Sequence, residues 1–170
     1  MDIYTIWMES AMIFMAVLLV ATAAAKLFDR EGGWRRPARW GMALAMIFAG
    51  MSHLLMPEPF VQHIPVWVPL REALVAVSGV VEIALGGWML YPPAHRMLSG
   101  RVMAAYLAAV WPANIYVAVA GIDVDGQPGG AYPWIRIPLQ VLFIAWVLWS
   151  TRDDRSGLAR TAPEAAGSAA

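Results

Sequence analysis

The chain has 170 residues, of which 60% are hydrophobic and only 14% are charged, and its 12 basic residues balance its 12 acidic residues. A soluble domain of this length rarely carries so few charges, so the composition places the chain among membrane proteins. The zero net charge, without a basic stripe between aromatic residues, argues against nucleic acid as a partner. The absence of cysteine excludes disulfides, thiol redox chemistry and thiolate metal sites.

Five apolar stretches follow one another along the chain, each close to the roughly 20 residues that cross a hydrocarbon core of about 30 Å. The predicted spans cover residues 3–25, 38–56, 72–91, 102–121 and 134–150. We expect residues 1–150 to form a single transmembrane helical domain and residues 151–170 to form a disordered cytoplasmic tail, because its end is rich in Ala, Gly and Ser. The predicted fold class is an all-α, polytopic membrane helical bundle.

The loops between these spans differ in charge, and the difference predicts their orientation. The segment 26–39 is the most basic short loop, whereas the connector at 57–69 and the loop at 122–133 contain no Lys or Arg. Because basic loops stay in the cytoplasm, we expect five spans with the N-terminus outside and the C-terminus inside. A signal peptide is the competing interpretation of the first stretch, but its start carries Asp2 and Glu9 and no basic residue.

Five polar residues stand inside the predicted spans, where each costs free energy unless it has a partner. They are His53, Glu82, Asn114, Arg136 and Gln140. At a rise of about 1.5 Å per residue, all of them fall in the outer half of the membrane. We expect Glu82 to supply the counter-charge to Arg136, with the two amides alongside. The five residues therefore predict one ligand-binding pocket.

Two further features support close contacts around this pocket. Gly79 and Gly86 share the helix face of Glu82, so a neighbouring backbone can approach the carboxylate. Pro112 cannot donate a hydrogen bond to the carbonyl group of Ala108, and we expect this freed carbonyl to line the pocket.

A structural interpretation stays open beside the functional one. Glu82 and Arg136 are also compatible with a structural ion pair, the two amides with hydrogen bonds that hold helices together, and His53 with a residue at a helix end. His63 and His95 fall in predicted loops, and no two histidines share a helix at ligand spacing. The pattern therefore predicts no metal site and assigns no catalytic residue.

Several motifs resemble the DoxX-like family of small bacterial membrane proteins. They are Ala49-Gly50-Met51-Ser52-His53 with Pro57, Phe60, Pro65 and Pro69; Ser78-Gly79-Val80-Val81-Glu82 with Leu85-Gly86; Trp111-Pro112-Ala113-Asn114-Ile115-Tyr116; and Trp134-Ile135-Arg136-Ile137-Pro138-Leu139-Gln140. The resemblance covers about residues 40–149. It implies a four-helix core formed by the second to fifth predicted spans, one extra N-terminal transmembrane helix, and a multi-pass location in the bacterial inner membrane.

The resemblance also implies a class of function, because the family takes its name from a protein associated with quinone-linked thiosulfate oxidation. We expect an accessory or redox-associated membrane subunit, not an enzyme on its own, whose pocket binds a small amphipathic ligand such as a quinone or a lipid. Expected partners are the lipid bilayer, a membrane or periplasmic redox protein, and further copies of the chain. If the protein takes part in catalysis, it would be a subunit of a quinone-linked oxidoreductase. Two alternatives stay open: a small proton-coupled transporter that uses Glu82, and a purely structural membrane bundle.

Overall fold

The computed structural model describes residues 10–152 except 31, 92, 126, 128 and 129. Within these residues the protein is all-helical and has no strand, which confirms the predicted all-α class. The start of the first predicted span and the predicted tail beyond residue 152 lie outside the described residues. The helices in chain order are α2 (Ser10–Phe28), α3 (Arg35–Leu55), α4 (Glu58–Val61), α5 (Arg71–Leu90), the 3-10 helix η1 (Pro93–His95), α6 (Arg96–Ala120) and α7 (Tyr132–Ser150).

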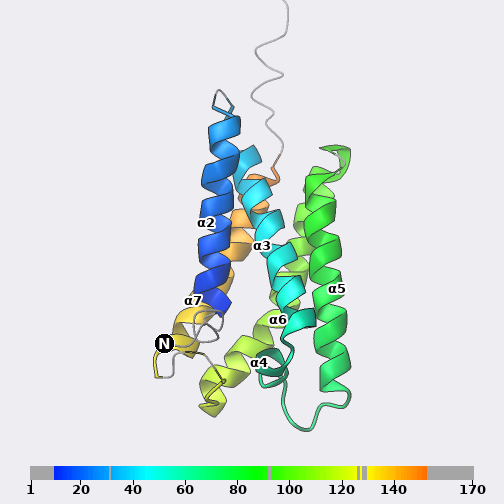
Figure 1. The fold of residues 1–170 in the computed structure, drawn as a ribbon, viewed down its shortest axis with the longest axis vertical. Helices are drawn as coiled ribbons and strands as arrows, with labels where there is room; N and C mark the ends of the chain where they lie inside the picture. Colours follow the sequence, from blue (N-terminus) through cyan, green and yellow to red (C-terminus); the bar gives the residue numbers. More distant parts are fainter. Residues whose placement is uncertain (1–9, 31, 92, 126, 128–129, 153–170) are drawn as a thin grey trace, which may run out of the picture.

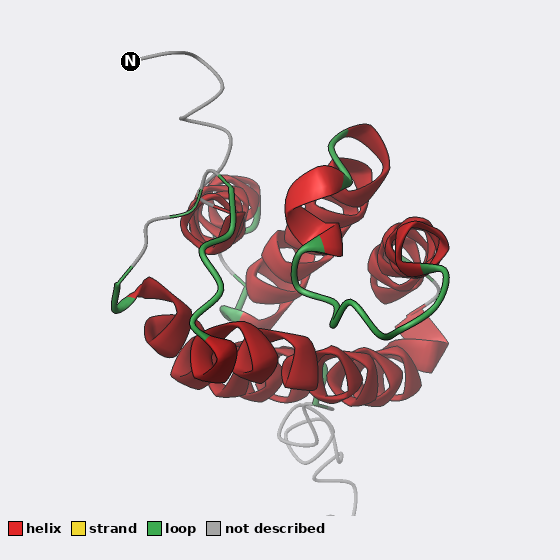
Figure 2. Cartoon of the chain, turned by 90° about the horizontal axis from the view of Figure 1, so that it is seen from below, coloured by secondary structure: helices red, strands yellow, loops and turns green. Residues whose placement is uncertain are grey.

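The long helices form two groups that meet face to face. α3 packs closely on both α2 and α5, while α6 packs on α7. Contacts between the two groups are fewer and come mainly from α3 with α7 and from α5 with α6. Figure 1 shows α2, α3 and α5 side by side, and Figure 2 shows them nearly end-on in a row, with the α6–α7 pair lying along one side.

Glycine residues set the close approach of α3 and α5. A Cβ atom on Gly79 would lie 2.7 Å from the carbonyl oxygen of Gly50, and one on Gly86 would lie 2.7 Å from the carbonyl oxygen of Ala43. Neither contact leaves room for a side chain, so the two backbones touch directly. The predicted approach of a neighbouring backbone to the helix face of Glu82 is confirmed, and the neighbour is α3.

A continuous apolar core joins the two groups of helices. Its largest fully buried side chains come from four helices and are at most 1% exposed: Leu18, Met42, Met46, Met103 and Val147. Methionine is unbranched and flexible, so it fills the irregular space where helices cross at an angle. The core holds the row α2–α3–α5 against the α6–α7 pair.

Three helices, α5, α6 and α7, are long and apolar enough to cross a membrane. In the most apolar 18-residue stretch of each helix, only 33%, 28% and 22% of the residues are buried inside the protein. Most of their apolar side chains therefore face outward. Such wide apolar surfaces are typical of contact with lipid. α3 falls short because Arg39 and His53 lower its hydropathy, and the described apolar part of α2 is limited to Met12–Phe28. Five spans therefore stay a prediction.

Candidate functional site

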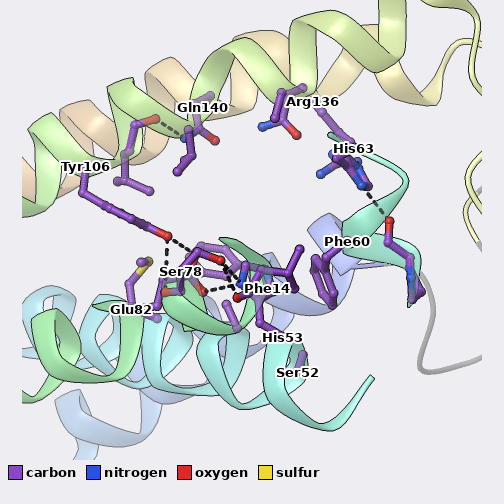
Figure 3. A pocket seen from close by; sticks show the side chains of 18 of the residues that line it. Phe14, Ser52, His53, Phe60, His63, Ser78, Glu82, Tyr106, Arg136 and Gln140 are labelled. Atoms are coloured by element: carbon purple, nitrogen blue, oxygen red, sulfur yellow. Dashed lines mark hydrogen bonds and ion pairs between the residues drawn. The ribbon is translucent and has the colours of Figure 1, made fainter. Parts of the chain in front are cut away.

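A cavity of about 510 Å³ lies between the two groups of helices. Its size falls within the range of about 300–1,000 Å³ that is usual for small-molecule sites. All six described α-helices contribute to its walls, which are mostly apolar. The walls include Phe143 as well as Phe14 and Phe60, which are labelled in Figure 3. The five residues that the sequence singled out all line it: His53, Glu82, Asn114, Arg136 and Gln140.

Glu82 lies near the middle of α5 and is only 6% exposed. The hydroxyl group of Tyr106 on α6 donates a hydrogen bond to Oε1 of Glu82 at 2.8 Å. On the other side, Nδ1 of His53 lies 3.5 Å from Oε2 of Glu82 and 2.8 Å from Oγ of Ser78. Ser78 donates its own hydrogen to the carbonyl oxygen of Val75, so His53 must be the donor toward Ser78. The carboxylate is thus held between α3 and α6.

One oxygen of this carboxylate accepts no hydrogen bond from the part of the chain that the structure describes. Oε2 of Glu82 is buried and has no hydrogen-bond partner among the described residues. An unsatisfied buried acceptor costs about 1–3 kcal/mol, and such atoms are rare in native proteins unless water or a ligand completes them. Because Oε2 is itself buried, a small molecule in the cavity can bond to it only after a side-chain rotation that exposes this atom.

The prediction that Arg136 neutralises Glu82 is wrong. Nη1 of Arg136 donates to Nε2 of His63 and, at 2.8 Å, to Oε1 of Gln127. Figure 3 shows Arg136 and His63 near one end of the cavity and Tyr106 and Glu82 near the other. The physical reason is position along the helices: Arg136 lies in the second turn of α7, next to the connector that carries His63, whereas Glu82 lies in the middle of α5.

The two amides also differ from the expectation. Nε2 of Gln140 donates to the carbonyl oxygen of Leu107 at 2.7 Å, and not to Glu82. The carbonyl of Ala108 was expected to line the pocket, but Ala108 is exposed on the outward face of α6 and does not line the cavity. Asn114 lines the wall, and its amide makes no hydrogen bond to another described residue.

His63 closes the end of the cavity where Arg136 lies. Its Nδ1 donates to the carbonyl oxygen of Pro59 at 2.8 Å, while its Nε2 accepts from Arg136, so the ring is neutral with its proton on Nδ1. Burial, together with the positive charge of Arg136, lowers the pKa of His63 to about 4. This imidazole therefore acts as a hydrogen-bond acceptor for the guanidinium at neutral pH.

Two loops meet above this end of the cavity. Nε2 of Gln62 donates to Oδ2 of Asp125 at 2.7 Å, and the backbone N–H of Asp125 donates to Oε1 of Gln62 at 2.9 Å. These reciprocal bonds join the connector between α3 and α5 to the loop between α6 and α7. Arg136 of α7 joins the same two segments, because it bonds to His63 of the connector and to Gln127 of the loop.

Sequence reasoning missed Tyr106 and His63. Tyr106 and Glu82 both lie near the middle of their helices, so their matching depth was a usable signal for the pair. No such signal existed for His63, because its place depends on α4 turning the connector back over the cavity.

The phenol of Tyr106 should contribute measurably to stability. Tyr106→Phe would remove the hydrogen bond to Oε1 and leave both oxygens of Glu82 without a partner, so we expect a loss of about 1–3 kcal/mol. The measurement is the unfolding midpoint of the purified protein. Tyr116→Phe is the control, since Tyr116 lies on the same helix and does not line the cavity. Equal midpoints for the two variants would contradict the assigned bond.

Comparison with known proteins gives a family and no activity. No curated protein and no solved structure matches the chain. The sequence model of one family matches residues 42–151, which is more than half of the chain and includes all five predicted site residues. The chain therefore belongs to the family described as Domain of unknown function (DUF8561).

Proposed function

We propose that the protein is an integral membrane protein with five spans whose cavity binds a small amphipathic ligand. One observation carries this proposal: polar residues from α3, α5, α6 and α7 line a single, mostly apolar cavity in which Oε2 of Glu82 has no partner. An apolar ligand body fits the aromatic and aliphatic walls, and a polar group can satisfy Oε2 once a rotation of the Glu82 side chain exposes it. A bundle that used its polar residues only to hold helices together would not need a cavity of about 510 Å³ beside them.

The ligand class and the location follow from the sequence. The resemblance to DoxX-like proteins favours a quinone or a lipid in the inner membrane of a bacterium. Following the charge of the loops, the N-terminus lies outside and the C-terminus inside, so the cavity end that carries His63 faces outward. In this position the protein acts as an accessory subunit for a membrane or periplasmic redox partner, and its own residues supply binding, not catalysis.

Identification of bound small molecules tests the proposal. The protein is extracted in a mild detergent, purified, and analysed by mass spectrometry for co-purifying quinones and lipids. We expect one species in stoichiometric amount. A preparation that is folded and empty under several extraction conditions would contradict ligand binding.

Substitution of the central carboxylate separates function from structure. Glu82→Gln still offers an oxygen to Tyr106 but replaces Oε2, an acceptor without a partner, by an NH₂ donor. We expect the bound ligand to fall at least about tenfold, the equivalent of one hydrogen bond of about 1.4 kcal/mol, while the unfolding midpoint without ligand changes little. Glu72→Gln, on the exposed part of the same helix, is the control. Unfolding of the Glu82 variant alone would favour a purely structural network.

A further inference from the structure

The guanidinium of Arg136 has an unused edge. Arginine has five N–H donors, and both hydrogens of Nη1 are taken by Nε2 of His63 and Oε1 of Gln127. The hydrogens on Nε and Nη2 have no acceptor among the described residues, and neither nitrogen is sealed off from a small molecule in the way that Oε2 of Glu82 is. The edge formed by Nε and Nη2 has the geometry that binds a carboxylate or a phosphate through two parallel hydrogen bonds.

Arg136 also has no counter-charge within the described part of the chain. Its hydrogen-bond partners are a neutral imidazole and an amide, and the ring of Tyr132 stands 5.9 Å from its Cζ. Of the two acids in the adjoining loop, Asp123 is exposed and has no ion pair with Arg136, and Asp125 is bonded to Gln62. Glu82 is bonded to Tyr106 at the other end of the cavity. A positive charge on an apolar wall is costly without an anion, so the site is electrostatically incomplete.

We propose that the ligand of this cavity carries an anionic head, a carboxylate or a phosphate, that binds the free Nε–Nη2 edge of Arg136, with its apolar body lying between the two groups of helices. This inference rests on the proposed function and narrows its ligand to an acidic amphiphile. His63 and Gln127 are positioning residues, because they hold Nη1 and thereby aim the opposite edge of the guanidinium into the cavity.

The opposite end of the cavity fixes the orientation of such a ligand. The acidic group of Glu82 offers an anionic head no N–H donor, because Oε1 already accepts from Tyr106 and Oε2 is a buried acceptor. A reversed ligand would put its anionic head beside an acid that offers it no donor and would leave Arg136 without a counter-charge, so only one orientation satisfies both ends. The acid at one end and the arginine at the other therefore act together in selecting a ligand with a single acidic terminus.

Matched probes that differ only in head group test this inference. Hexadecanoate and hexadecanol are titrated into the delipidated full-length protein at mildly alkaline pH, where the carboxylate is ionised, and occupancy is measured by native mass spectrometry. We expect the carboxylate to bind about tenfold to a hundredfold more tightly than the alcohol. A third arm uses lysophosphatidic acid with the same chain: tighter binding of this probe than of hexadecanoate identifies a membrane lipid as the source of the head, and the reverse identifies a free fatty acid.

Variants assign the preference to Arg136. Arg136→Gln should lower hexadecanoate binding to the level of hexadecanol binding and so abolish the preference, whereas Arg71→Gln, which does not line the cavity, should keep it. If Arg136→Gln fails to fold, Arg136→Lys retains the charge without the planar fork and should keep a reduced preference. Equal binding of acid and alcohol, or a preference that survives Arg136→Gln, overturns the inference but leaves the proposed function standing. Binding of no probe, together with an empty purified protein, overturns both.

Discussion

Gly79→Val is expected to destabilise the protein by about 3 kcal/mol, the upper end of the usual cost of overpacking. The first atom of any side chain at this position would lie 2.7 Å from the carbonyl oxygen of Gly50 and 2.9 Å from Cβ of His53. Valine adds two methyl groups with little rotational freedom, so α3 and α5 must move apart along their whole contact. The measurement is the free energy of unfolding in detergent, compared with the wild-type protein.

The same helix offers a matched control. A Cβ atom at Gly87 would meet nothing within 4 Å, so Gly87→Val makes the same chemical change without a clash. We expect Gly87→Val to stay within about 1 kcal/mol of the wild type, because valine has a somewhat better helix propensity than glycine. Similar losses for both variants would show that the effect comes from valine in a helix and not from the contact between α3 and α5.

The contact between α3 and α5 also determines the geometry of the cavity. It sets His53 of α3 against Ser78 and Glu82 of α5, with Nδ1 of His53 3.5 Å from the carboxylate. Separation of the two helices by a side chain at Gly79 would therefore lengthen this distance as well as weaken the fold. Loss of ligand in Gly79→Val should accompany its loss of stability, unlike in Glu82→Gln.

The positions of the helices and the polar residues that line the cavity could both be predicted from the sequence, for related reasons. Long apolar stretches have few alternatives to a helix, and polar residues that interrupt them must turn away from lipid. That rule placed His53, Glu82, Asn114, Arg136 and Gln140 on inward faces, and all of them line one cavity. Glycine spacing on α5 predicted its close neighbour for the same local reason.

Pairing within the cavity could not be predicted in the same way. Position along a helix gives depth and face, but not the angle at which helices cross, and the α6–α7 pair lies across the row of the other three (Figure 2). That arrangement puts Tyr106, and not Arg136, opposite Glu82. The fold of the connector is equally nonlocal, since α4 brings His63 to Arg136 across 73 positions of sequence.

His63 makes the end of the cavity sensitive to acid. Its two ring nitrogens are both engaged, Nδ1 as a donor to Pro59 and Nε2 as an acceptor from Arg136. A second proton can enter only at Nε2, where it would replace the hydrogen bond by a contact between two positive groups. His53 lies close enough to add a smaller unfavourable charge interaction. The folded protein therefore holds His63 neutral until the pH is well below the ordinary range of histidine.

The free energy of unfolding should consequently fall as the pH is lowered from about 6.5 to about 4. The upper limit is the ordinary pKa of histidine, and the lower limit is the lowered pKa of His63. Within this window the unfolded chain binds a proton at His63 and the folded chain does not, so acid favours unfolding by up to about 3 kcal/mol, whereas the full stability is present at pH 7. His63→Gln keeps an acceptor for Arg136 but has no titrating group, and its loss of stability over the same window should be smaller by that amount. His95→Gln, at an exposed position outside the cavity, should keep the wild-type dependence. The measurement is the free energy of unfolding of the three proteins across this pH range. Parallel curves for the wild type and His63→Gln would show that the imidazole of His63 does not cause the loss of stability in acid.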